Sequence, residues 1–285
     1  MVNDGSTDGT SQICDQLALQ DERIRVFHKE NGGVSSARNL ALEQMRGDYV
    51  SIIDGDDWID ETLFEDAIGA MEKHNAQVFM FEYAVENHGT TNVHSVNPSF
   101  YGLIQTEEAL INTITPNNRF AWSKIFKASL IKGNRFDEKI ILGEDTLFIS
   151  NVITNAERVF YSQNSYYHYI VRENSAVNSD FNMKKLSGLN AYYLQIQMCS
   201  EKGYRIAEEH AREALVELAV ALARRVSESG GNNKKEAMKI IKSYIRPEAK
   251  KIMLSKYACN KTKAKVVVAI ISVRLTAFLC DKLGA

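Results

Sequence analysis

The sequence predicts an α/β protein with a mostly parallel sheet, followed by a helical C-terminal region. Strand-like and helix-like segments alternate through the first half of the chain, and helical periodicity alone continues from about residue 181. The 285 residues are 45% apolar and 25% charged with only 3 Pro, which is typical of a folded chain and excludes disordered and collagen-like classes. This length gives room for one large domain with a smaller appendage.

The first strands and helices are expected in alternation. Strand-like runs lie at 24–28 (IRVFH), 49–53 (YVSII) and 77–83 (QVFMFEY). Segments 35–46 and 60–74 lie between them and repeat apolar residues at helical spacing. Alternation of this kind indicates βα units around a largely parallel sheet.

The middle of the chain is less regular. Residues 86–135 are rich in turn formers and predict insertions and edge structure, with a short helix near 106–113. A helix is expected after Gly143, and the β-prone segments ERVFYS and SYYHYIV follow it.

The C-terminal part is predicted to be helical. Helical patterns cover 183–200, 206–228 and 234–254. We therefore divide the chain into a body, residues 1–178, and a helical region, residues 179–285.

Charge is distributed unevenly along the chain. Residues 231–285 carry 13 Lys and Arg against 3 Asp and Glu, whereas residues 1–230 carry 21 against 33. A basic tail on an acidic body indicates an anionic partner, either a membrane surface or nucleic acid. Nucleic acid is disfavoured because the tail lacks aromatic stacking partners and any recognised binding motif.

Residues 266–280 form an apolar segment after the Lys-rich sequence NKTKAKV. Such a segment is too short to span a bilayer, which takes roughly 17–25 residues. It predicts either an in-plane amphipathic helix on anionic lipid or a helix packed on the body.

The cysteines and the N-terminus indicate a reducing compartment. The four cysteines are too far apart for a zinc cluster, and the N-terminus has neither the basic nor the apolar region of a signal peptide. We expect a cytoplasmic location, with a peripheral position on the inner face of the plasma membrane.

The most informative acidic segment closes the second strand. Asp54, Asp56 and Asp57 follow the apolar run 49–53, at the strand end where open α/β sheets bind ligands. Clustered carboxylates repel one another unless a cation lies among them, which favours Mg²⁺ or Mn²⁺ shared with substrate phosphates. The alternative is a solvated turn before the next helix, with Asp60 as its N-cap.

Two further polar segments are weaker when each is taken alone. The stretch VNDGSTDG at 2–9 has the composition of an ordinary turn. Glu144 and Asp145 open a predicted helix, where the helix dipole favours carboxylates in any protein.

Taken in order, these segments resemble the family-2 glycosyltransferases of the GT-A fold. The shared motifs are the Asp-Gly-Ser turn, the helix start GGVSSARN at 32–39, the DxD-type strand end, the Glu-Asp pair and the aromatic run YYHYIVRENSAV. The resemblance covers roughly residues 1–175 and implies a nucleotide-sugar-binding, Rossmann-like GT-A sheet.

The resemblance also implies roles for individual residues on the donor side. Asp4 contacts the nucleotide base, usually uracil, and Arg38 lies over the same base. Asp54 faces the ribose and the metal, and Asp56 ligates the cation that bridges the donor diphosphate.

On the acceptor side, the resemblance implies that Asp145 is the general base and that Glu144 lies beside it near the acceptor. Arg172 and Ser175 match a later Arg-x-x-Ser element that closes over the diphosphate.

One departure from the family lies at the start of the chain. A complete member has another strand, loop and helix before the Asp-Gly-Ser turn, whereas Met1 stands directly before Val2 and Asn3. We therefore expect the first βα unit to be missing, with reduced stability because a central strand would be absent.

The predicted function is inverting, metal-dependent transfer of a sugar from a nucleoside diphosphate donor, expected to be a UDP-sugar, to a glycan or lipid-linked acceptor, as in cell-surface polysaccharide synthesis. One alternative is a catalytically incomplete remnant that acts as a membrane-surface interaction protein. Another is a phosphohydrolase with an aspartyl nucleophile, but Trp58 occupies the position where that pattern wants Thr or Val.

Overall fold

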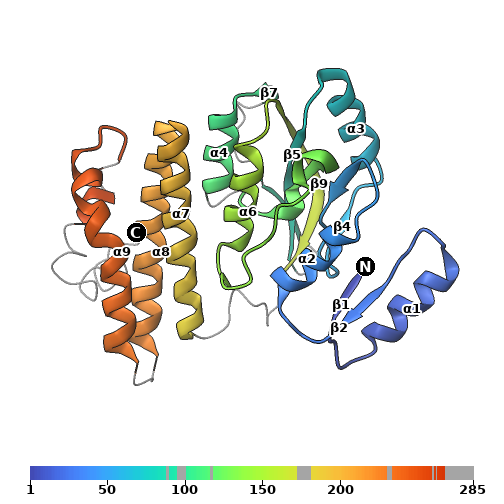
Figure 1. Cartoon of the computed structure of the whole chain (residues 1–285), viewed down its shortest axis with the longest axis horizontal. Helices are drawn as coiled ribbons and strands as arrows, with labels where there is room; N and C mark the ends of the chain where they lie inside the picture. Colours follow the sequence, from blue (N-terminus) through green and yellow to red (C-terminus); the bar gives the residue numbers. More distant parts are fainter. Residues whose placement is uncertain are drawn as a thin grey trace.

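The computed structural model of the protein describes residues 1–87, 90–94, 101–115, 118–171, 181–229, 233–258, 260 and 262–266. Three parts follow one another along the long axis (Figure 1). A small N-terminal unit lies at one end, a sheet flanked by helices lies in the middle, and a block of long helices forms the other end.

The N-terminal unit is a βαβ motif. Strand β1 (Val2–Asp4) pairs in parallel with β2 (Phe27–Lys29), and helix α1 (Thr10–Gln20) connects them. Among the described residues, β1 and β2 form a two-stranded sheet that is separate from the main sheet.

The main sheet has seven strands and is mixed. Its central order is β3-β8-β5-β9-β4, with β6 paired to β5 and β7 paired to β9. The strands are β3 (Tyr49–Ser51), β4 (Trp58–Ile59), β5 (Val78–Asn87), β6 (Thr90–His94), β7 (Gly102–Ile104), β8 (Lys124–Lys127) and β9 (Val159–Ile170).

The prediction of a mostly parallel main sheet is corrected by these pairings. The β5–β9 pair is parallel, but β3–β8, β5–β8, β4–β9, β5–β6 and β7–β9 are antiparallel. The connection from β5 to β6 shows the reason most directly. It spans only two residues, and a link this short joins antiparallel neighbours, whereas a parallel pair needs a long crossover.

The interpretation of residues 86–135 as insertions and edge structure is confirmed for β6 and β7 and wrong for β8. Strand β8 lies between β3 and β5, inside the sheet. Ile125 and Phe126 are 1% and 0% exposed, because helices cover both faces of the sheet at this point. The short helix expected near 106–113 is α4 (Thr106–Ile114).

Alternate residues of β5 serve two cores. Val78 and Met80 belong to the large core beneath α4 and α6 (Glu144–Ile153). Phe79 and Phe81 point to the opposite face and pack in a second core with α3 (Leu63–His74). The alternation follows from the two-residue period of a strand buried on both faces.

Helix α3 illustrates how local sequence determines an element. Leu63, Ala67 and Met71 recur at four-residue spacing and are fully buried. The helix ends at Asn75, whose φ of 50° places it in the left-handed region that commonly terminates helices. The remaining helices of the body are α2 (Val34–Glu43), α5 (Ala128–Ile131) and the short 3₁₀ turn η1 (Ala121–Ser123).

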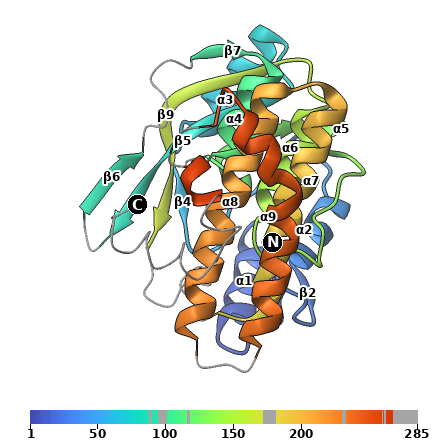
Figure 2. The same ribbon diagram turned by 90° about the vertical axis from the view of Figure 1, so that its left-hand side faces the viewer.

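The predicted C-terminal helices are confirmed. They are η3 (Met183–Leu186), α7 (Ser187–Lys202), α8 (Arg205–Glu228) and α9 (Lys234–Leu254). Helices α8 and α9 pack side by side (Figure 2).

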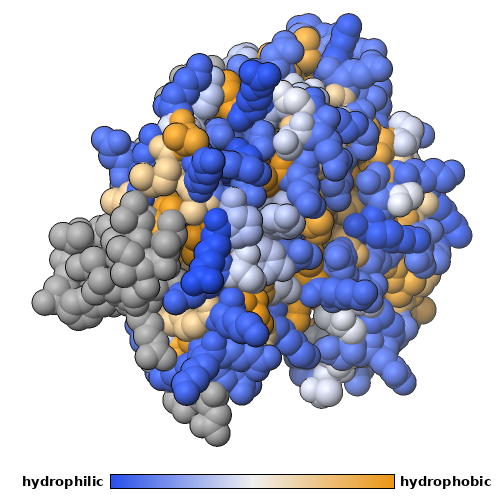
Figure 3. Space-filling model, turned by 60° about the vertical axis from the view of Figure 1, so that its left-hand side comes forward, coloured by the Kyte–Doolittle hydropathy of each residue, from blue (hydrophilic) through white to orange (hydrophobic). Residues whose placement is uncertain are grey.

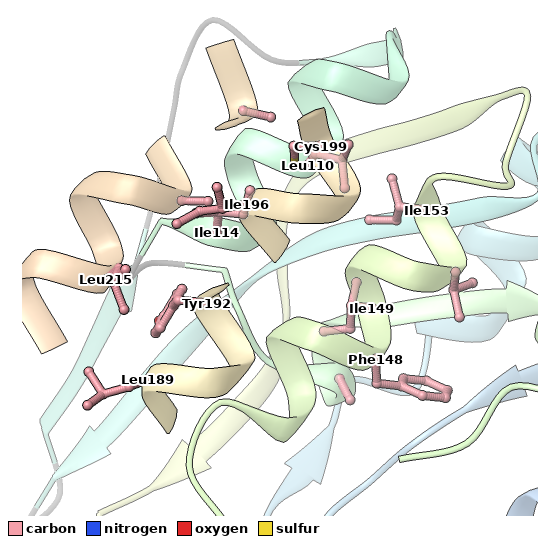
Figure 4. Close-up of a cluster of buried hydrophobic side chains, with 14 of the residues drawn as sticks. Leu110, Ile114, Phe148, Ile149, Ile153, Leu189, Tyr192, Ile196, Cys199 and Leu215 are labelled. Carbon is pink, nitrogen blue, oxygen red and sulfur yellow. The ribbon is translucent and has the colours of Figure 1, made fainter. Parts of the chain in front are cut away.

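These helices share the large core with the body rather than forming a separate one. Ile149 and Ile153 of α6 lie in the same cluster as Leu189, Tyr192 and Ile196 of α7 (Figure 4). The body and the helical region are therefore joined by continuous apolar packing.

None of the helices in the described ranges combines the length and the apolar character needed to cross a membrane. Of the apolar segment 266–280, only Val266 lies within the described residues, where it is buried in a small cluster beside α8 and α9.

Candidate functional site

The acidic turn after β3 is fixed to strand β9. The Asp54 backbone N–H donates to the Tyr167 hydroxyl at 3.2 Å, and that hydroxyl donates to Asp57 Oδ2 at 2.6 Å. Asp57 Oδ1 accepts the Ile170 N–H at 2.9 Å. Burial raises the pKa of Asp57, against the opposing effect of these two hydrogen bonds. Asp57 is therefore a structural part of the turn, whereas Asp56 is exposed to solvent.

Arg38 connects this turn to the Glu-Asp pair. Its guanidinium donates through Nη2 to Asp54 Oδ1 at 3.0 Å and through Nη1 to Asp145 Oδ1 in a close ion pair. Glu144 Oε1 lies 3.8 Å from the same Nη1. The Arg38 side chain is only 10% exposed. Burial opposes its charge, but the carboxylates outweigh burial and raise the pKa of Arg38.

Glu144 and Asp145 are the first two residues of α6. Gly143 precedes them with a φ of 83°, a conformation that suits glycine and starts the helix at this position. Asp145 Oδ2 accepts the Ala121 N–H at 3.0 Å, so both oxygens of this carboxylate are bonded.

The two carboxylates share one buried environment. Burial raises the pKa of Asp145, with the Arg38 charge opposing it. Burial and the neighbouring Asp145 charge raise the pKa of Glu144 to about 7. A carboxyl group whose pKa is raised toward neutral pH beside a fixed cation is the arrangement found in proton-transfer sites.

A buried lysine supports this pair, and sequence reasoning missed it. Lys124 Nζ is 0% exposed and donates to the Asn118 carbonyl at 2.7 Å, the Phe120 carbonyl at 2.9 Å and the Ser123 hydroxyl at 2.8 Å. Burial lowers the pKa of Lys124 to about 7, with the Asp145 charge opposing that effect. The lysine therefore holds the loop whose Ala121 N–H binds Asp145.

Asp4 lies where β1 meets the start of α2. Its Oδ1 accepts from Lys29 Nζ at 2.7 Å and from the Gly32 N–H at 2.9 Å, and its Oδ2 accepts the Gly33 N–H at 2.8 Å. Burial works against ionisation, but these donors outweigh it and lower the pKa of Asp4. Asp4 therefore fixes the loop that leads into the helix of Arg38.

The structure thus unites four predicted site residues directly, namely Arg38, Asp54, Glu144 and Asp145. The sequence predicts that Arg38 lies over a nucleotide base. In the structure its guanidinium lies between the carboxylates of Asp54 and Asp145. Asp4 is linked to this group through the start of α2. Arg172 and Ser175 lie outside the described residues.

His168 is held in place by its neighbours in the sheet. Its ring lies 2.8 Å from Glu86 Oε1 and 3.2 Å from Asp60 Oδ1, and it stacks on Trp58 with ring centroids 3.4 Å apart. These contacts account for the side chain without a ligand.

The residues at the turn fit a divalent cation that substrate would help to hold. Within the described ranges, no three His, Cys, Asp or Glu side chains converge as a complete metal site. Asp54 and Asp56 offer two carboxylates, which suits Mg²⁺ or Mn²⁺ because these ions take one or two carboxylates and complete their shell with water and phosphate oxygens. The donor set is therefore compatible with a shared site rather than a protein-only one.

The chain is similar to known proteins both in sequence and in fold. Residues 1–137 match the family described as glycosyl transferase family 2. This part of the chain is similar to glycosyl transferase family 2. The predicted resemblance to this family is therefore confirmed over residues 1–137.

Curated relatives are named glycosyltransferases. Glycosyltransferase GlyA of Streptococcus pneumoniae is 30% identical over 233 residues, which cover 78% of this chain and 33% of GlyA. Putative glycosyltransferase EpsH of Bacillus subtilis is 28% identical over 75% of this chain and 63% of EpsH. The chain thus spans between about a third and two thirds of the length of these relatives.

The GT-A fold is confirmed by a solved structure. A fragment of TarS from S. aureus, crystallised in complex with UDP-GlcNAc, aligns with a TM-score of 0.69 at 21% identity over 99% of this chain and 82% of the fragment. The α/β architecture and the helical C-terminal region are therefore those of a known glycosyltransferase fold.

Proposed function

We propose that this protein transfers a sugar from a UDP-sugar donor to a glycan or lipid-linked acceptor with inversion, in the synthesis of a cell-surface polysaccharide. The observation that carries the proposal is the Arg38 cluster, which joins the acidic strand end at Asp54 to the Glu144–Asp145 pair. TarS of S. aureus, named poly(ribitol-phosphate) beta-N-acetylglucosaminyltransferase and 28% identical over 64% of this chain, supports the donor and acceptor class.

Proton removal is assigned to Asp145. Its carboxylate is held by Arg38 on one oxygen and by the Ala121 N–H on the other, so its orientation is fixed before substrate arrives. A fixed carboxylate takes the proton from the attacking hydroxyl as the new glycosidic bond forms. Attack from the face opposite the departing nucleoside diphosphate inverts the anomeric centre, and one base is sufficient.

Donor binding is assigned to Asp4, Arg38, Asp54 and Asp56. Asp54 and Asp56 would hold Mg²⁺ or Mn²⁺, which when bound neutralises the charge of the departing diphosphate. Asp4, at the end of β1 and bonded to the loop before α2, faces the base in this proposal. Arg38 contacts both Asp54 and Asp145 and so fixes the distance between them. In this proposal, one residue therefore positions the donor-binding carboxylate relative to the base that faces the acceptor.

The proposed place of work is the cytoplasmic face of a membrane, where nucleotide-sugar donors and lipid-linked acceptors meet. The basic character of residues 231–285 supports this position, because Lys and Arg near an anionic surface are attracted to it.

Donor turnover tests the proposal. The protein is incubated with Mn²⁺ and UDP-GlcNAc, and release of UDP is followed with and without a glycan acceptor. UDP release that D145N abolishes is the expected result. Absence of UDP release from the wild type, with no calorimetric binding of UDP and Mn²⁺, would favour the alternative of a catalytically incomplete relative.

A further inference from the structure

Helix α9 carries a row of basic residues on its solvent-facing side. Lys235, Lys239, Lys242, Arg246 and Lys250, here called the basic stripe, follow one another at spacings of four, three, four and four residues. At about 100° per residue, all five fall within an arc of about 80° and extend over about 22 Å of helix. The five residues of the stripe therefore share one side of the helix.

The opposite side of α9 is the packing face. Ala237, Ile241, Ile245 and Ile252 are at most 1% exposed and lie against neighbouring helices. This packing holds the helix in one rotational position, so the stripe is presented permanently to the outside.

Within the described ranges, the charges of the stripe have no ion-pair counterpart. Across the described ranges, none of the five side chains takes part in an ion pair or hydrogen bond. The acidic residues of α9 do not offset them. Glu248 is buried and binds Arg212 at 2.8 Å, and Glu236 lies in the first turn, outside the arc. A merely solvated helix face usually mixes both signs of charge, so the absence of acidic residues points to an anionic partner.

Exposed apolar side chains continue the stripe at the C-terminal end of the helix. Met253 falls within the same arc and is 41% exposed, and Leu254 and Tyr257 are 75% and 50% exposed. Lys256 Nζ lies 5.0 Å above the ring of Tyr257. A row of cations that ends in exposed Met, Leu and Tyr is the chemistry of a helix lying in a membrane interface, where cations meet headgroups and apolar tips enter the acyl boundary.

We propose that the basic stripe, with Met253, Leu254 and Tyr257, docks the protein on the anionic phospholipid surface of a membrane. The inference deepens the membrane position in the proposed function by assigning the surface that makes the contact. Helix α9 lies at the end of the long axis remote from β1, α1 and β2, so docking through it leaves the nucleotide side of the protein accessible (Figure 1).

The shape of this surface distinguishes a bilayer from a polyanionic chain. The stripe lies on a convex helix, and the face of the molecule on that side is mostly hydrophilic with hydrophobic patches between (Figure 3). Phosphate groups alone would make no use of the exposed Leu254 and Tyr257, whereas a bilayer offers both anionic headgroups and an apolar layer.

Vesicle sedimentation tests the proposal. The full chain is mixed with phosphatidylcholine vesicles, with or without phosphatidylglycerol, at low and high salt. We expect binding only with phosphatidylglycerol, weakened by salt. The triple variant K239E/K242E/R246E should bind more than about tenfold more weakly. The matched control K132E/K139E/K202E changes the net charge equally at exposed lysines elsewhere and should bind like the wild type.

Two further arms separate the other outcomes. The variant M253S/L254S/Y257S should bind vesicles more weakly than the wild type and bind inorganic polyphosphate equally well. Vesicle binding by this variant as strong as that of the wild type would overturn the proposal. So would a wild type that binds polyphosphate but not vesicles. Equal losses in the two charge variants would overturn it as well. UDP-GlcNAc hydrolysis in solution should be unchanged by K239E/K242E/R246E, so failure of the transferase function and failure of docking give different results.

Discussion

Arg38 and Asp145 stand 107 residues apart in the sequence and form a buried ion pair that joins α2 to the first turn of α6. The same guanidinium binds Asp54 at the end of β3. Two segments that the proposed function assigns to the donor and to the acceptor are therefore tied to one cation. In the proposed function, Arg38 would determine the distance across which donor and acceptor meet.

Replacing the cation tests this bridge. R38M should destabilise the fold by about 3–5 kcal/mol, because it leaves Asp54, Glu144 and Asp145 close together without a counter-charge. It should also abolish UDP release. Urea denaturation measures the first effect. The control R135M removes the ion pair between Arg135 and Glu43, whose side chains are both 48% exposed. It should lower the free energy of unfolding by less than about 1 kcal/mol. Equal costs in the two variants would contradict the bridging role.

The assignment of the base can be separated from the role of its neighbour. D145N should reduce UDP release by at least about 100-fold while calorimetric UDP binding is retained, because the amide cannot accept the proton. E144Q should reduce release less than D145N does. A larger loss in E144Q would move the role of base to Glu144, whose carboxylate has fewer hydrogen bonds than that of Asp145.

The raised pKa of Glu144 predicts how stability depends on pH. The folded protein holds this proton up to about pH 7, whereas the unfolded chain releases it near the ordinary value of 4.5. The free energy of unfolding should therefore fall as pH rises from about 4.5 to 7, by an amount on the order of 2 kcal/mol from this group. Urea denaturation across this range measures the slope, which E144Q should flatten. An unchanged slope in E144Q would assign the dependence to other groups.

Much of the fold follows from local sequence, and the exceptions have a common cause. Helices α7, α8 and α9 were predictable because their apolar residues repeat at helical spacing over long runs. The interior place of β8 was not predictable, because a strand that contains Lys124 does not resemble a central one. The Lys124 ammonium group donates hydrogen bonds to the carbonyls of Asn118 and Phe120, and the positions of these carbonyls depend on tertiary structure.

The candidate site shows the same division. The motif order predicts Arg38, Asp54 and Asp145 as site residues. Their contact with one another was not predictable, since no local pattern encodes an ion pair across more than a hundred residues. Likewise, the structural role of Asp57, which differs from the roles proposed for Asp54 and Asp56, depends on its hydrogen bond with Tyr167. Only the folded sheet brings Tyr167 to the turn.

The buried lysine should matter through the loop that it holds. K124M leaves the Asn118 and Phe120 carbonyls without their donor, so the free energy of unfolding should fall by about 2–5 kcal/mol. Because Ala121 would no longer be held against Asp145, UDP release should also fall at temperatures where the variant is still folded. K124R keeps a charged donor and should recover part of the activity. Full activity in folded K124M would show that the loop orients Asp145 without help from the lysine.

The acidic turn predicts different consequences for two adjacent carboxylates. D56N should raise the Mn²⁺ concentration needed for UDP release by more than about tenfold, because Asp56 is exposed and would contribute a metal ligand. D57N should instead lower stability, since Asp57 binds the Tyr167 hydroxyl and the Ile170 N–H. Titration of Mn²⁺ into chelator-treated protein, with thermal melting of each variant, separates the two effects. If D57N shifted the Mn²⁺ requirement and D56N did not, the cation would belong with Asp57, and the assignment of Asp54 and Asp56 as its ligands would be wrong.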